Sequence, residues 1–290
     1  MTLLLVDGMN LFVRSYMAAS AHMHLTSPDG IDTGALYLWI NAISKHLREE
    51  KPDRVVVCWD SWGSQYRLAI DPEYKAGKRG ALRDKSDQVK QDALVRAKQF
   101  LSLSGIFHVE MDGWEADDII AAYWQQAQKT DEQIIIVSGD KDLLQLVGPN
   151  CVQIRGDARW TTETVLDQKG VLPEHLPAYM AFVGDQADNV RGVPGVGPKR
   201  AIKALSEHGW DFHTALEANW PDRREDGLRS LRLVDLRNLP YETLGLWLNP
   251  APVWQPVVVG TPLSTYLYDF LEYLGMESIL KRYLVGDLWA

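Results

Sequence analysis

The stretch Leu3-Leu4-Leu5-Val6-Asp7 decides the fold, because it is an apolar run ending at an acid and this arrangement recurs along the chain. The run Val55–Trp59 is followed at once by Asp60, and the run Ile134–Val137 is followed shortly by Asp140. All three runs are continuously apolar instead of alternating, which is typical of parallel strands covered on both faces. We therefore expect them to form the central strands of one sheet.

Helical patterns lie between these runs. Apolar residues recur at spacings of three and four between Leu36 and Leu47, and a second pattern extends from about residue 88 to 104 and stops at Gly105. Strands that alternate with helices along a chain predict a doubly wound, mostly parallel α/β layer.

The character of the chain changes after about residue 168, where short helical segments are punctuated by Pro and Gly. Helix signals at 173–183, 198–207 and 262–284 include prolines suited to first-turn positions. The prolines between 240 and 262 predict an extended stretch that wraps back over the body. We expect two domains, an α/β core over residues 1–168 and an α-helical domain over residues 169–290.

The composition places the protein among ordinary globular proteins, since 290 residues with 46% hydrophobic side chains can bury a sizeable core. No apolar stretch approaches the ~20 residues that span a bilayer, and no signal-peptide core is present. With only Cys58 and Cys151, the sequence offers neither a disulfide framework nor a cysteine zinc site. We expect a cytoplasmic protein without a membrane partner.

The net charge of −9 argues against a polyanionic partner only until its distribution is considered. Residues 75–90 hold six bases against two acids. Nine acids in motif positions account for the whole excess of negative charge, so the chain is expected to carry a basic rim around an acidic pit. These acids are Asp7, Asp60, Glu115, Asp117, Asp118, Asp140, Asp142, Asp185 and Asp188.

The acids that follow the three apolar runs should meet, because the carboxyl ends of parallel strands share one edge of a sheet, where α/β proteins bind ligands. A further group, Glu115-Ala116-Asp117-Asp118, begins a helix. Each acid alone would suit a capping role, since Asp and Glu oppose the helix dipole and cap loops. As a set they would repel one another and raise their pKa values unless cations compensate.

Oxygen ligands without His or Cys suit hard ions such as Mg²⁺ and Mn²⁺. Two such ions about 4 Å apart can activate a water, clamp a scissile phosphate and neutralise the leaving oxygen. The seven histidines of the chain fall in no recognisable motif. The acids therefore predict a site for phosphodiester hydrolysis.

A glycine-rich segment, residues 190–201, lies between two predicted helices. Its glycines allow a tight turn, and the amides that open the second helix can face an anion. A plain helix connection is the alternative, but Lys199 and Arg200 at the helix start favour contact with a nucleic-acid backbone.

Taken together, these motifs resemble the flap endonuclease-like 5′ nucleases of bacteria and phages, including the N-terminal nuclease domain of DNA polymerase I. The resemblance covers nearly the whole chain, most specifically residues 1–205, and the blocks agree in order and spacing. The matching blocks are residues 6–11, 59–60, 74–79, 113–118, 138–143, 184–189 and 190–201.

The resemblance implies a PIN-like α/β core with a helical arch at about 66–100. It also implies a helix-hairpin-helix (helix-three-turn-helix) motif at about 173–207 that binds DNA. Two Mg²⁺ ions are implied, which Mn²⁺ can replace. Their ligands would be Asp7, Asp60, Glu115 and Asp117 around one ion, and Asp140, Asp142, Asp185 and Asp188 around the other, with Asp118 assisting from behind.

The resemblance further implies contacts with DNA. Lys75 would contact the scissile phosphate, Arg14 and Arg67 would bind phosphates, and Tyr74 would stack on a base. In the hairpin, K⁺ would be held by the backbone carbonyls of Val193 and Val196. The remaining DNA-binding residues implied are Lys78 and Arg79 in the arch and Gly195, Gly197, Lys199 and Arg200 in the hairpin.

The function implied is that of a structure-specific 5′ nuclease, a 5′-3′ exonuclease or flap endonuclease acting in replication or repair. Its substrates would be 5′ flaps, branched DNA and 5′-ended duplexes, with RNA primers left open. One alternative is a PIN-type ribonuclease, which usually lacks the arch and the hairpin. The other is a non-catalytic DNA-junction binder, which predicts eroded carboxylates, whereas all nine are intact.

Overall fold

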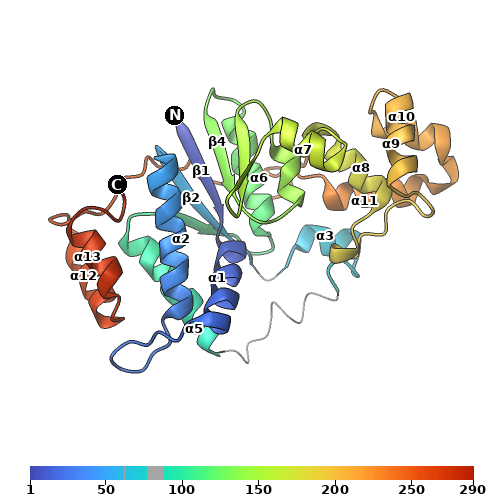
Figure 1. Ribbon diagram of the computed structural model, residues 1–290. Coiled ribbons are helices and arrows are strands. Elements are labelled where there is room, and N and C mark those ends of the chain that lie inside the picture. The colour runs from blue at the N-terminus through green and yellow to red at the C-terminus, as the bar shows by residue number, and fades with distance from the viewer. Residues whose placement is uncertain (62, 77–87) are drawn as a thin grey trace.

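The computed structural model describes residues 1–61, 63–76 and 88–290, and it contains a single six-stranded sheet. Five strands are parallel and the last is antiparallel. The three apolar runs are neighbours at the centre of this sheet, as predicted (Figure 1). The strands in spatial order are β3 (Phe107–Glu110), β2 (Arg54–Trp59), β1 (Thr2–Asp7), β4 (Gln133–Val137), β5 (Cys151–Arg155) and β6 (Ala158–Trp160).

Alternate residues of β1 face opposite sides of the sheet, and both sides are covered. Leu4 and Val6 pack into a core with three helices, whereas Leu3 and Leu5 pack against one helix on the other face. This two-sided burial explains why the strand is apolar at every position. The three helices of the first face are α1 (Gly8–His22), α2 (Gly34–Glu50) and α5 (Gln88–Leu103), and α6 (Ala116–Ala127) covers the second.

Another core lies beyond the sheet and is built by short helices. The Phe182 ring lies at its centre, 4.8 Å from the Phe212 ring and 5.2 Å from the Trp220 ring. Leu68 and Ile70 of α3 pack against it, so α3 joins this core to the α/β layer. The helices here are α3 (Gln65–Ile70), α8 (Leu176–Val183), α9 (Pro198–Glu207), α10 (Phe212–Asn219) and α11 (Arg224–Val234), and α7 (Thr162–Lys169) lies between β6 and α8.

The predicted C-terminal domain, residues 169–290, is divided in the structure. After α11 the chain runs back across the α/β layer, where Val253 forms a β-bridge with Arg54. Helices α12 (Ser264–Tyr273) and α13 (Glu277–Leu284) then pack in the core of α2 and α5, at the opposite end of the molecule from α9 and α10 (Figure 1). The wrapping of the proline-rich stretch is confirmed, but a single helical unit over 169–290 is not found.

The predicted arch, about 66–100, begins in α3 and ends in α5. Lys78 and Arg79 lie outside the described residues, so their predicted roles remain predictions. Among the residues that are described, none of the helices combines the length and apolarity that crossing a membrane requires.

Candidate metal centre

The ends of the central strands place the first acids as predicted. Asp7 closes β1 and caps α1, since its Oδ1 accepts from the Asn10 amide at 2.9 Å and its Oδ2 accepts from the Ser138 hydroxyl at 2.7 Å. Burial raises the pKa of Asp7 to about 7, and the charges of Asp60 and Asp140 add to the shift. The strand-end acids therefore lie close enough to repel one another.

Three more acids gather at the start of α6, and we call Glu115, Asp117 and Asp118 the α6 group. Carboxylate oxygens of all three lie within 4.8 Å of one another. Glu115 and Asp118 also form a capping box at the helix start, so the capping role of these two is real. Burial, together with the charge of Asp118, raises the pKa of Asp117 well above its usual value. Asp60 joins them by accepting from the Ala116 amide at 2.8 Å.

A second set, which we call the loop group, consists of Asp142, Asp185 and Asp188. Its carboxylate oxygens also lie within 4.8 Å of one another. Asp142 begins a 3-10 helix, Asp142–Leu146. The other two belong to a second 3-10 helix after α8, Gln186–Asp188, which Asp185 caps and Asp188 ends. Burial raises the pKa of Asp142 to about 7, and the charges of Asp140, Asp185 and Asp188 contribute. The helical half of the chain thus completes a site begun by the sheet.

The Ser138-Gly139-Asp140 loop is held by hydrogen bonds on every side. The Gly139 amide donates to Asn10 Oδ1 at 2.9 Å, and Gln153 donates to the carbonyls of Ser138 and Asp140 at 3.0 and 2.6 Å. A Cβ at Gly139 would lie 3.0 Å from Asn10 Oδ1, which favours glycine there. Asp140 is therefore fixed beside the loop group.

The site fits divalent cations. Asp117 Oδ1 and Asp142 Oδ1 are buried and lack a hydrogen-bond partner in the part of the chain that the structure describes. Buried carboxylate oxygens without partners are costly unless a cation binds them. Because the two groups offer oxygen ligands alone, they suit Mg²⁺ or Mn²⁺ better than a softer metal.

Arg67 does not lie where the sequence interpretation placed it. Its side chain is 1% exposed, so contact with a DNA phosphate does not agree with the structure. The guanidinium instead donates to Asp118 Oδ2 at 2.7 Å and Glu115 Oε2 at 3.2 Å. Its Nε donates to the Leu233 carbonyl at 2.9 Å. Arg67 is a buried counter-charge for the α6 group.

Tyr74 is likewise buried, with 4% of its surface exposed, which disagrees with the predicted stacking on a base. Its hydroxyl donates to Glu115 Oε2 at 3.0 Å. The neighbouring Lys75 lies between the two groups: its Nζ is 2.9 Å from Glu115 Oε1 and 3.6 Å from Asp188 Oδ2. Lys75 adopts a left-handed conformation, with φ 51°, and its amide donates to the Asp188 carbonyl at 2.8 Å.

The glycine-rich segment forms a tight connection between α8 and α9. A Cβ at Gly192 would lie 2.5 Å from the Gly184 amide nitrogen, so only glycine permits this approach. Val193 and Val196 are buried, while Gly195 and Lys199 are exposed. Two further residues of this segment were predicted to bind DNA. Gly197 directly precedes α9, and Arg200 donates to the Gly195 carbonyl at 2.8 Å.

The other predicted phosphate-binding residue, Arg14, is exposed on α1 and lies beside Gly156 in the turn between β5 and β6. Two residues of the site escaped the sequence interpretation. Lys141 Nζ lies 2.8 Å from Asp185 Oδ2, and Gln145 bonds to the backbone of Asp142 at 2.8 Å. Lys141 lies within the acidic block of residues 138–143, between Asp140 and Asp142, and this position could have indicated its place in the site.

The fold and the two carboxylate groups define an α/β protein with a site suited to divalent metal ions. The family described as "5′-3′ exonuclease, N-terminal resolvase-like domain" matches residues 2–175. The chain is 32% identical over 291 residues to the 5′-3′ exonuclease of Aquifex aeolicus, covering 97% of this chain and 94% of that protein. This chain belongs to the 5′-3′ exonuclease family.

Other relatives and solved structures agree. DNA polymerase I of Caldicellulosiruptor bescii is 35% identical over 216 residues, which cover 72% of this chain but only 24% of the polymerase. The T5 D15 protein, co-crystallised with metal ions, superposes with a TM-score of 0.69 at 20% identity, over 99% of this chain and 98% of that one. Flap endonuclease-1 from Methanococcus jannaschii gives a TM-score of 0.56 at 18% identity, over 99% and 91%. These structures share the fold.

Proposed function

We propose that this protein is a divalent-metal-dependent, structure-specific 5′ nuclease that hydrolyses DNA phosphodiesters. The observation that carries the proposal is the pairing of two buried carboxylate groups with Lys75 between them. Carboxylates gathered in this way destabilise the protein unless cations bind, so their presence argues for a function that uses the cations.

Mg²⁺ is the ion that we assign to both groups, with Mn²⁺ able to replace it. When bound, the two ions would supply an activated water and stabilisation of charge on the phosphate. The chain supplies the ligands: Asp7, Asp60, Glu115 and Asp117 for one ion, and Asp140, Asp142, Asp185 and Asp188 for the other. Asp118 is bonded to Arg67 and holds the α6 group in place instead of serving as a direct ligand.

Lys75 is the side chain that we expect to contact the scissile phosphate. Its ammonium group bridges the two carboxylate groups, and its backbone amide donates to the Asp188 carbonyl. A cation aimed at the place where negative charge develops stabilises the transition state more than the bound substrate. Arg14, exposed on α1, is a second candidate for a phosphate contact.

DNA binding away from the cut is assigned to the connection between α8 and α9. Gly195 and Lys199 are exposed there, and the start of α9 offers free amides to a phosphate. We infer that this segment, including Gly197, acts as a helix-hairpin-helix and that carbonyls near Val193 and Val196 hold K⁺. Arg200 would first have to leave the Gly195 carbonyl to reach DNA.

The relatives suggest a setting for this activity. DNA polymerase I is among the proteins that match, over 72% of this chain for the one from Caldicellulosiruptor bescii, and solved neighbours include the catalytic core of Rad2 in complex with DNA. We infer a role in DNA replication or repair, with the protein acting as a monomer in the cytoplasm.

Incubation of a labelled 5′-flap DNA with the protein, with Mg²⁺ and with EDTA, tests the proposal. We expect cleavage near the branch only when the metal is present. Binding without cleavage in either condition would favour a junction-binding protein, and cleavage of a single-stranded RNA in preference to the flap would favour a PIN-type ribonuclease.

Lys75→Ala tests the role of Lys75 separately. We expect the single-turnover cleavage rate to fall on the order of 10²-fold while binding of the flap weakens much less, because the charge matters most in the transition state. An unchanged rate combined with weaker binding would remove Lys75 from the chemistry.

A further inference from the structure

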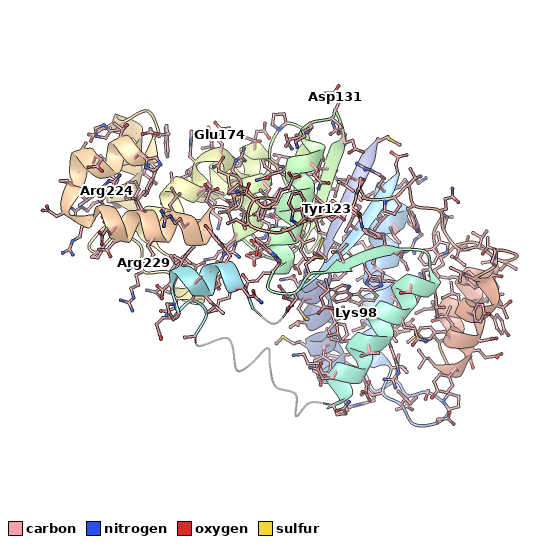
Figure 2. The ribbon with its side chains drawn as sticks, turned by 180° about the vertical axis from the view of Figure 1, so that it is seen from behind. Lys98, Tyr123, Asp131, Glu174, Arg224 and Arg229 are labelled. Carbon is pink, nitrogen blue, oxygen red and sulfur yellow. The ribbon has the colours of Figure 1, made fainter. Side chains whose placement is uncertain are left out.

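The C-terminal end of α11 reaches the centre of the molecule, although it lies far along the chain from the acidic motifs. Leu233, Val234 and Leu236 line the same cavity as Asp117 and the loop group. Helix α11 also lies beside α3, as Figure 2 shows where Arg229 on α11 stands next to the short cyan helix. The matched family domain ends at residue 175, so this contact comes from outside it.

The last turn of α11 presents backbone carbonyls that no further helical turn can satisfy. Two buried side chains satisfy them. Arg67 Nε donates to the Leu233 carbonyl at 2.9 Å, and Gln145 Nε2 donates to the Val234 carbonyl at 3.0 Å. Consecutive carbonyls of one helix end are therefore bonded to side chains from α3 and from the 3-10 helix Asp142–Leu146.

Gln145 bonds through both the nitrogen and the oxygen of its side-chain amide. Its second Nε2 hydrogen goes to the Asp142 carbonyl at 2.8 Å, and its Oε1 accepts from the Leu236 amide at 2.8 Å. The side chain is fully buried, so each bond is costly to lose. Gln145 thus ties the backbone of the loop-group residue Asp142 to both sides of the α11 end.

Arg67 makes the equivalent connection for the α6 group. The guanidinium is bonded to Asp118 and Glu115, while its Nε reaches the same helix end as Gln145. The end of α11 can therefore set the distance between the two carboxylate groups. Both are fixed to one common support.

We propose that Arg67 and Gln145 are positioning residues, and that the end of α11 fixes the α6 group and the loop group relative to each other. The proposal rests on the proposed function, since it assigns the support of the metal-binding groups. Residues that orient metal ligands from behind typically change metal affinity or activity by about 10- to 100-fold when they are replaced.

The test compares Gln145→Met with Gln125→Met in the full chain. Gln125 is a matched control, because its Nε2 also donates to two carbonyls of the segment after α11, those of Arg237 and Leu239, both at 2.9 Å. It lies near the far end of α6, away from Glu115 and Asp118. Both variants remove an amide that holds this segment, but only one removes a bond to Asp142.

The measurement is a Mn²⁺ titration without DNA, followed by the paramagnetic resonance signal of the free ion, together with the melting temperature of each variant. We expect wild type and Gln125→Met to bind two ions alike. We expect Gln145→Met to bind at least one ion about 10- to 100-fold more weakly. Equal Mn²⁺ binding by the two variants would overturn the positioning role of Gln145.

Arg67→Lys is the second variant, and it decides the question if Gln145→Met does not fold. Lysine keeps the charge beside Asp118 but cannot also bond to the Leu233 carbonyl as the guanidinium does. We expect Arg67→Lys to bind Mn²⁺ more weakly than the wild type does. An Arg67→Lys variant with the same Mn²⁺ affinity as the wild type would overturn the proposal that α11 supports both groups. A wild-type protein that binds no Mn²⁺ would overturn the proposed function as well, so the two failures are distinguishable.

Discussion

The α6 group and the loop group are both triads of carboxylates, but the protein compensates their charges differently. The α6 group lies at one helix start and receives hydrogen bonds from three buried or half-buried side chains, those of Arg67, Tyr74 and Lys75. The loop group is assembled from two segments. Its Asp185 pairs with Lys141, whose side chain is 48% exposed, and its Asp188 lies 3.6 Å from Lys75 Nζ, farther than Glu115 does. The α6 group is therefore stabilised by the fold itself, whereas the loop group depends more on bound metal.

The largest expected effect comes from the loop group, because it depends most on metal. Asp185→Asn should lower the single-turnover cleavage rate on the order of 10³-fold, by removing an oxygen ligand and the charge stabilisation it permits. The control is Asp131→Asn, at an exposed residue labelled in Figure 2 that precedes β4 and lies at the opposite end of the strand from the acids. A near-wild-type rate in a folded Asp185→Asn would remove Asp185 from the site.

The next effect concerns the α6 group and is one of stability. Arg67→Met should lower the free energy of unfolding by about 3–5 kcal/mol, since it leaves Asp118 and Glu115 buried without their counter-charge. Chemical denaturation in EDTA measures this loss. A loss below about 1 kcal/mol, which is typical of an exposed ion pair, would show that the α6 group is not internally compensated.

A smaller effect of the opposite sign is expected in the loop group. Asp142 has its pKa raised to about 7, so its native carboxyl retains a proton that the unfolded chain loses near pH 4. The metal-free protein should therefore lose stability as the pH rises from about 4 to 7, and remain at the lower level above that range.

Asp142→Asn removes this cost. In EDTA at pH 8 it should raise the free energy of unfolding by at least about 1 kcal/mol, the worth of roughly one pKa unit. It should also make the pH profile less steep, although Asp7, with its pKa raised to about 7, still contributes a slope. Denaturation curves at pH 5 and pH 8 give the comparison. A variant that is less stable than wild type at pH 8 would contradict the assignment of repulsion to the loop group.

The smallest effect is expected for Lys141→Met. Lys141 is 48% exposed although Asp185 is only 5% exposed, so water screens the lysine charge and replaces it when it is lost. The free energy of unfolding should change by less than about 1 kcal/mol. Set beside Arg67→Met, this variant compares the loss of one cation from each group. If Lys141→Met lowered the free energy of unfolding as much as Arg67→Met does, the two groups would not differ in how their charges are compensated.

Much of the site could be predicted from the sequence because strand ends and acids follow simple rules. The apolar runs marked parallel strands, and parallel strands bring Asp7, Asp60 and Asp140 to one edge whatever lies between them. Lys75 lies beside the acids, and its contact with the scissile phosphate stays a prediction.

The positions of Arg67 and Tyr74 could not be predicted, because a basic, aromatic stretch indicates nucleic acid equally well whether its side chains point outward or inward. Arg67 lies on α3, which packs against the helical core, and Tyr74 is part of that core. Both are buried by long-range contacts with no local signature. The same holds for Gln145, whose partners Val234 and Leu236 lie about ninety residues away. Tertiary contacts of this length decide which polar residues serve as supports.

The central claim is that the two carboxylate groups hold two separate metal ions, and a crystal structure of the protein grown with Mn²⁺ tests it most directly. Anomalous scattering identifies the ions independently of the refined coordinates. We predict two peaks, one contacted by Glu115 and Asp117 and the other by Asp142 and Asp185, with Lys141 released from Asp185. A single peak, or none, with both lysines still bonded to the carboxylates would contradict the account.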